Sequence, residues 1–233
     1  MLPVLGRNHA VPSARLSACD KYQKLNSSAQ FMPQVQLSEN LRDAFTEIAN
    51  IAVGQTADKI ARSFSTFVVM PIPRVHLLES ADIHMALTAM DGADSVTAVT
   101  QAFFAEGISG EALLLFGTGT GSDLSQLMGY EPTSDPRAQL EHMLEMASLL
   151  NGSCIQSVLE QLEIDVLIGY PVLLGQRKRA SEMFADYKFP WSETLAIELN
   201  YTFENFATTC DLVLLFHQQA LPTLFKKLEV LLA

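Results

Sequence analysis

The sequence has little cysteine, no long apolar run and no leader-like start. Its three cysteines, Cys19, Cys154 and Cys210, are far apart, so it contains neither a disulfide framework nor a zinc-binding spacing. No apolar stretch approaches the roughly 20 residues that a membrane-spanning helix needs. The apolar start is too short for a signal peptide and is interrupted by Arg7 and His9. We therefore expect a cytoplasmic protein that does not insert into a membrane.

Basic residues are also scarce, since 15 Lys and Arg stand against 26 Asp and Glu, for a formal net charge of −11. A nucleic-acid-binding protein would show a basic stripe, and the only dense basic stretch is residues 177–179. The five histidines have no metal-ligand spacing, so we expect no metal site and no cofactor of the protein's own. An acidic protein is suited to a partner that offers lysine or arginine.

The chain divides into an arm and a duplicated region. Residues 1–36 show no sustained period and are expected to form an irregular N-terminal arm. Residues 37–233 carry one pattern twice, with repeat one at 37–130, a linker at 131–136 and repeat two at 137–233. Each copy has a long helical pattern, a proline, two strand patterns and a short helical pattern.

Fixed offsets relate the two copies. Glu47 and Glu145 are 98 residues apart, Pro73 and Pro171 are also 98 apart, and the segments ALLLF and LVLLF are 100 apart. Nearly one spacing for three markers indicates an internal repeat. We predict one pseudo-symmetric α+β domain, in which strands from both repeats form one antiparallel sheet and the two long helices lie on one face.

Local patterns place the elements of repeat one. A long helix is predicted over 38–64, with Ser38 as its N-cap. Two strands are predicted over 95–107 and 110–117, joined by a turn over 107–110. Apolar residues of the long helix recur at helical spacing: Leu41, Phe45, Ile48, Ile51, Ala52 and Ile60. Of these, Leu41, Phe45, Ile48 and Ala52 are expected to pack on the sheet.

The same helix carries a polar ridge, which we define as Asp43, Glu47, Asn50 and Gly54. Their spacings of four, three and four residues place them on one helix face. Gly54 adds no side chain, so a large partner can approach closely there. Polar residues on such a face are usually only solvated, so the ridge by itself does not establish a site.

The segment DAFTEIAN, followed by Pro73, resembles the signature of the CheC, CheX and FliY chemotaxis phosphatases. That signature is Asp or Ser, three residues, Glu, two residues, Asn, twenty-two residues and Pro, and it is matched by Asp43, Glu47, Asn50 and Pro73. The flanking segments IANIAVG and EGISGEALLLF are similar to the family as well. The resemblance covers residues 38–232.

The resemblance implies a hydrolase of two-component signalling, which removes the phosphoryl group from the aspartate of a CheY-like response regulator. The regulator supplies Mg²⁺ and a lysine that neutralise the phosphoryl oxygens, and it lacks a well-placed water. Positioning and charge neutralisation dominate phosphoryl transfer, so an amide that orients water is sufficient. A CheD-like protein modulates some relatives and is left open as a partner.

The resemblance also gives roles to the matched residues. Asn50 would hold the attacking water in line, and Glu47 would pair with the regulator's lysine through a charge-assisted hydrogen bond. Asp43, one turn earlier, would support docking. Pro73 would be structural, because proline ends one element and fixes the start of the next.

Repeat two departs from the signature. Glu141, Glu145 and Pro171 stand at the corresponding places, but Ser148 stands where Asn is expected. A serine hydroxyl lacks the reach and the paired donor and acceptor of a carboxamide. Asn151 cannot replace it, because six residues after Glu145 is about 240° around the helix. We therefore predict one competent site and one degenerate second site.

The alternative function is that of a non-catalytic adaptor, which binds a response regulator without hydrolysing its phosphate, or of a flagellar-switch-like protein. The intact Glu47 and Asn50 favour the enzyme, and Ser148 mildly favours the adaptor. A third interpretation, an unrelated helix-and-sheet oligomerisation domain, requires the signature match to be a coincidence.

Overall fold

The computed structural model describes residues 37–79, 81–82, 85, 95–117, 120–184, 193–206 and 208–232. The predicted N-terminal arm, 1–36, lies outside the described residues. The elements, in chain order, are α2 (Glu39–Phe64), β1 (Val68–Val69), β2 (Arg74–Glu79), β3 (Val96–Ala105), β4 (Ile108–Phe116), α4 (Thr120–Leu127), α5 (Pro136–Gln161), β5 (Leu167–Ile168), β6 (Val172–Lys178), α6 (Ala180–Phe184), β7 (Glu193–Phe203), β8 (Thr209–His217), the short 3₁₀ helix η1 (Gln218–Ala220) and α7 (Leu221–Leu232).

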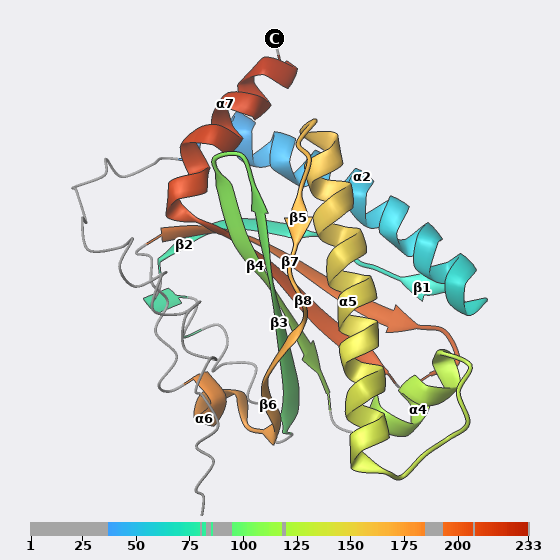
Figure 1. Cartoon of the computed structure of the whole chain (residues 1–233). Coiled ribbons are helices and arrows are strands. Elements are labelled where there is room, and N and C mark those ends of the chain that lie inside the picture. Colours follow the sequence, from blue (N-terminus) through green and yellow to red (C-terminus); the bar gives the residue numbers. More distant parts are fainter. Residues whose placement is uncertain are drawn as a thin grey trace, which may run out of the picture. The chain divides into compact units, whose positions relative to one another are not determined.

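The eight strands form one antiparallel sheet. Its order is β1-β7-β8-β4-β3-β5, with β2 also paired to β7 and β6 also paired to β3. The long strands β3, β4, β7 and β8 form the centre of the sheet, with α5 crossing it in Figure 1. The predicted α+β class with one antiparallel sheet is confirmed.

The two repeats are related by a pseudo-twofold axis. Leu113 of β4 pairs with Val213 of β8, the residue 100 positions later. In the helix layer, the Lys59 Nζ donates to the Ser157 Oγ at 3.4 Å, and these residues are 98 positions apart. A residue that contacts its own equivalent lies on the symmetry axis. The axis therefore passes through the β4–β8 pair and between α2 and α5, which confirms the predicted pseudo-symmetric repeat.

The repeats exchange strands at the two edges of the sheet. The strands β1 and β2 of repeat one pair with β7 of repeat two, and β5 and β6 of repeat two pair with β3 of repeat one. The sequence analysis did not predict these four strands. They are short and flank coil segments that contain prolines, where local strand patterns are weak.

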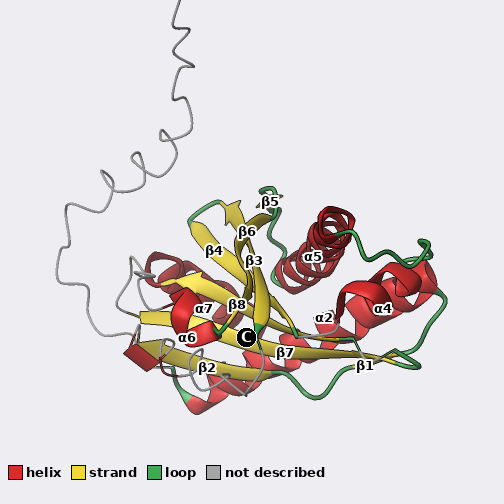
Figure 2. Ribbon diagram, turned by 90° about the horizontal axis from the view of Figure 1, so that it is seen from below, coloured by secondary structure: helices red, strands yellow, loops and turns green. Residues whose placement is uncertain are grey.

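The two faces of the sheet are covered unequally. Strand side chains alternate between faces, and one face packs with α2, α5 and α7 into the main core. A smaller cluster on the other face contains Ala180 and Phe184 of α6. The view in Figure 2 shows α5 and α4 together beside the sheet. The prediction that both long helices lie on one face is confirmed.

Side-chain caps define the starts of the two long helices. The N–H of Leu41 donates to the Ser38 Oγ at 3.3 Å, which confirms the predicted N-cap of α2. At the start of α5, the N–H of Arg137 donates to the Asp135 Oδ1 at 3.0 Å, and Pro136 takes the first helical position. Among the described residues, none of the helices is long and apolar enough to cross a membrane.

The turn between β3 and β4 differs from the prediction. The chain turns at Glu106 and Gly107, and residues 108–110 already belong to β4. Gly107 has a φ of 73°, a left-handed conformation that glycine adopts without a steric penalty. The predicted turn over 107–110 was wrong, because the pattern of two glycines was taken as a longer connection.

Candidate functional site

The polar ridge of α2 points away from the sheet. Asp43, Glu47, Asn50 and Gly54 are all exposed. No atom lies within 4 Å of the point that a Cβ on Gly54 would occupy, so the surface is open there. Helical periodicity therefore placed the ridge correctly, and a partner can approach it.

The opposite side of α2 packs on the sheet. Phe45 and Ala52 are fully buried, and Leu41 and Ile48 are partly buried against the same core. Ile51, another apolar position of the helical pattern, is 42% exposed. It follows Asn50 in the chain, which places an apolar side chain beside the ridge.

The two principal ridge residues have no competing contacts. Within the part of the chain that the structure describes, neither the Glu47 carboxylate nor the Asn50 carboxamide makes a hydrogen bond or an ion pair. The Glu47 carboxylate offers two acceptor oxygens, and the Asn50 amide offers both donors and an acceptor. These groups are available to a partner molecule or to water.

The corresponding residues of α5 form a second ridge, which we define as Glu141, Glu145 and Ser148. All three are exposed. Asn151, in contrast, is fully buried, and among the described residues no group bonds to its amide. Asn151 therefore points away from the second ridge, as predicted, and does not stand in for the asparagine of the signature.

The two signature prolines lie at equivalent places, between the short strands that follow each long helix. Pro73 directly precedes β2, and Pro171 directly precedes β6. Their structural role stays a prediction, and their position between elements fits a residue that fixes φ and donates no hydrogen bond.

Comparisons with known proteins give the fold its context. No family model and no curated protein matches the sequence. Among solved structures, Thermotoga maritima FliY aligns with a TM-score of 0.62 at 16% identity, over 84% of this chain and 98% of that chain. A chain of the FliM–SpeE complex of H. pylori gives a TM-score of 0.59 at 11% identity, over 84% of this chain and 97% of that chain. The FliM middle domain of H. pylori gives 0.56 at 10% identity, over 82% and 99%.

The chain has the fold of FliY and of the FliM middle domain. At these identities the likeness concerns the fold, and it confirms the fold that the sequence resemblance implied. The chain covers nearly the whole of each solved structure, so both repeats take part in the likeness.

Within this FliY-like fold, the second ridge has a contact that the sequence analysis missed. The hydroxyl of Tyr130 donates to the Glu145 carboxylate, at 3.0 Å from Oε2 and 3.2 Å from Oε1. That hydrogen bond, followed by the negative charge of Glu145, raises the pKa of Tyr130 above its ordinary value. The glutamates of the two ridges therefore differ, because Glu145 is bonded within the chain and Glu47 is not.

The backbone after α4 fixes the position of Tyr130. The N–H of Tyr130 donates to the Ser125 carbonyl at 2.8 Å, and the N–H of Gly129 donates to the Gln126 carbonyl at 2.9 Å. Gly129 has a φ of 79°. This pair of hydrogen bonds around a left-handed glycine is a Schellman motif, which ends α4 and directs the next residue.

The ring of Tyr130 is held as well. It stacks on His142, with ring centroids 4.4 Å apart and planes 9° apart. His142 Nδ1 lies 2.8 Å from the Oγ of Ser125, a residue that is fully buried. Because His142 and Glu145 are three residues apart on α5, one tyrosine contacts both.

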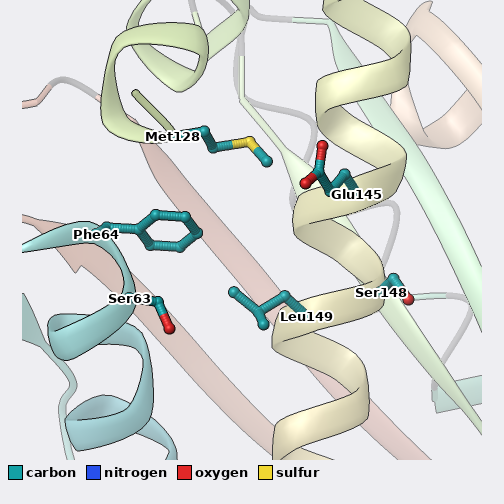
Figure 3. Close-up of a pocket in the computed structure, with 6 residues that line it drawn as sticks. All are labelled: Ser63, Phe64, Met128, Glu145, Ser148 and Leu149. Atoms are coloured by element: carbon teal, nitrogen blue, oxygen red, sulfur yellow. The ribbon is translucent and has the colours of Figure 1, made fainter. Parts of the chain in front are cut away.

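A cavity of about 420 Å³ lies beside the second ridge. Its walls come from the end of α2, the segment after α4 and the middle of α5: Ser63, Phe64, Met128, Glu145, Ser148 and Leu149. Figure 3 shows Glu145 and Ser148 on one helix of this cavity and Phe64 across from them. Three separate segments form it, so no local sequence pattern could predict it.

Three further titratable groups, Cys154, Tyr201 and Cys210, are fully buried in the core. Burial raises the pKa of Cys154 to about 12 and raises those of Tyr201 and Cys210 well above their ordinary values. Both thiols are fully buried and stay protonated, as expected for small core residues. In the described ranges, no three His, Cys, Asp or Glu side chains gather into a metal-binding group.

Proposed function

We propose that this protein hydrolyses the aspartyl phosphate of a CheY-like response regulator, with the α2 ridge as its site. The observation that carries the proposal is the pair of exposed, unbonded side chains Glu47 and Asn50, one turn apart on the same face of α2. They stand at the signature spacing on a chain with the fold of FliY and of the FliM middle domain.

The chemistry required of the ridge is modest. A response regulator holds its own Mg²⁺ and lysine around the phosphoryl group, so the enzyme has to position a water molecule in line with the phosphorus. The neutral carboxamide of Asn50 bonds to that water without repelling the phosphoryl oxygens, as a carboxylate would. The Mg²⁺ belongs to the regulator, and the ridge supplies orientation.

Glu47 and Asp43 hold the regulator in register. The Glu47 carboxylate pairs with the regulator's active-site lysine, in a charge-assisted hydrogen bond that is short and directional. Asp43 lies one turn earlier on the same face and adds a second acidic contact. The formal net charge of −11 favours approach by a partner that presents lysine.

Replacement of the water-orienting residue tests the proposal. We expect Asn50→Ala to slow phosphate release from a phosphorylated regulator by roughly a hundredfold, the scale on which mispositioning affects rates. Because Asn50 is exposed, its replacement should change the free energy of unfolding by less than about 0.5 kcal/mol. Candidate regulators would be phosphorylated with Mg²⁺ and a small phosphodonor, and phosphate loss followed with time.

The matched control is Gln55→Ala, which removes an exposed carboxamide from another side of the same helix. It should hydrolyse phosphate at the wild-type rate. Full activity in Asn50→Ala would contradict the site. A wild-type protein that binds a phosphorylated regulator and accelerates none would instead support the non-catalytic adaptor.

A further inference from the structure

The two ridges differ in one neighbouring residue as well as in the exchange of Asn50 for Ser148. In the short helices that follow the central strands, the repeats are offset by 100 residues, and Leu124 and Leu224 are both fully buried. The same offset makes Val230 the equivalent of Tyr130. Val230 is 69% exposed on a helix, α7, that continues to residue 232, whereas α4 ends at 127.

Because of this difference, the Glu145 carboxylate is hydrogen-bonded within the chain and the Glu47 carboxylate is not. Val230 has no hydroxyl, and the Glu47 carboxylate has no hydrogen bond or ion pair among the described residues. Tyr130 bonds to both carboxylate oxygens of Glu145, and the Schellman motif and the His142 stack fix its position. An incoming lysine would have to compete with this phenol for the Glu145 oxygens.

We infer that Tyr130 silences the second ridge by holding the Glu145 carboxylate, so that replacement of Ser148 by asparagine is not sufficient to create a second phosphatase site. This inference rests on the proposed function and adds Tyr130 as a residue that determines which of two related ridges is used. Tyr130 acts through Glu145 and has no part in the hydrolysis at α2.

The test starts from Asn50→Ala, which removes the first site. Into this background we would introduce Ser148→Asn, Tyr130→Val, or both, where valine is the residue of repeat one. Phosphate release from a regulator that the wild-type protein dephosphorylates is measured for each. Tyr130→Phe, in place of Tyr130→Val, separates the hydroxyl from the ring. Tyr170→Val serves as the control, since Tyr170 is 92% exposed and distant in sequence.

The expected result is non-additive. Ser148→Asn and Tyr130→Val should each leave the rate of the background unchanged within about twofold, and together they should raise it at least about tenfold. An equal gain from Ser148→Asn alone would overturn the role of Tyr130. No gain from the pair, in variants that retain the thermal unfolding midpoint of the background, would overturn it as well.

A titration of Tyr130 tests its contact with Glu145 without any activity measurement. This inference and the proposed function can therefore fail separately. The tyrosine absorbance that is lost in Tyr130→Phe should titrate above its ordinary pKa, and that pKa should fall towards the ordinary value in Glu145→Gln. An unchanged titration in Glu145→Gln would overturn the inference even if the α2 ridge is active. If the wild-type protein accelerates no regulator, the altered titration would still support a held Glu145.

Discussion

At the scale of single residues, exposure separates the groups that can meet a partner from those that hold the core. Asn50 and Asn151 are both asparagines of the long helices, yet the first is exposed and the second fully buried. Their directions follow from the helical period, since each turn spans 3.6 residues. Residue identity alone would therefore have assigned the same role to two groups in opposite environments.

His217 is a partly buried residue whose protonation should affect stability. Its Nδ1 lies 3.1 Å from the Ser109 Oγ, and burial lowers its pKa to about 4. The unfolded chain takes up the proton near pH 6.5, the ordinary value, while the folded chain does not. The stabilising effect is therefore complete above about pH 6.5 and is lost as the pH falls towards 4.

We expect this linkage to remove roughly 2–3 kcal/mol of the free energy of unfolding between pH 7 and pH 4. The measurement is urea unfolding at both pH values for the wild-type protein and for His217→Gln, in which this position does not titrate. The carboxylates titrate in both proteins, so the difference between them isolates His217. Identical losses in the two proteins would show that His217 titrates normally.

At the scale of elements, close packing of neighbouring strands explains a glycine that the sequence analysis placed in a turn. Gly110 lies within β4, between β3 and β8. A Cβ at this position would overlap the ring of Phe103 and the carbonyl oxygen of Leu215. Glycine is required there because two neighbouring groups fill the space, and the turn itself depends on Gly107.

Gly110→Ala should lower the free energy of unfolding by about 1–3 kcal/mol, the usual effect of overpacking in a core. The control is Gly117→Ala, for which the nearest atom, the Thr209 Oγ1, lies 3.8 Å from the added Cβ, an ordinary contact distance. Thermal or urea unfolding of both variants measures the difference. Equal stability of the two variants would mean that β3 and β8 move away from β4 with no loss in the free energy of unfolding.

At the scale of the whole described fold, exchange of strands makes the two repeats interdependent. The edge strands of each repeat pair with the other repeat, and the β4–β8 pair joins the halves at the centre of the sheet. The main core also takes buried residues from both long helices. Backbone pairing and a shared core therefore join the two repeats, and one scaffold displays both ridges.

A fragment of residues 37–130 should accordingly fail to fold alone. It contains β1 and β2 but lacks β7, the strand with which both of them pair. We expect circular dichroism to show no cooperative thermal transition for this fragment, and to show one after it is mixed with residues 137–233. A cooperative transition of the isolated fragment would contradict this interdependence.

The sequence by itself determined the features that depend on local periodicity. The repeat, both long helices, the Ser38 cap, the four long strands and the outward direction of Asp43, Glu47 and Asn50 all follow from spacings along the chain. Only the tertiary structure decided the four short edge strands, the need for Gly110 and the bond from Tyr130 to Glu145. Each of these depends on which segments become neighbours after folding, and a linear pattern does not contain that information.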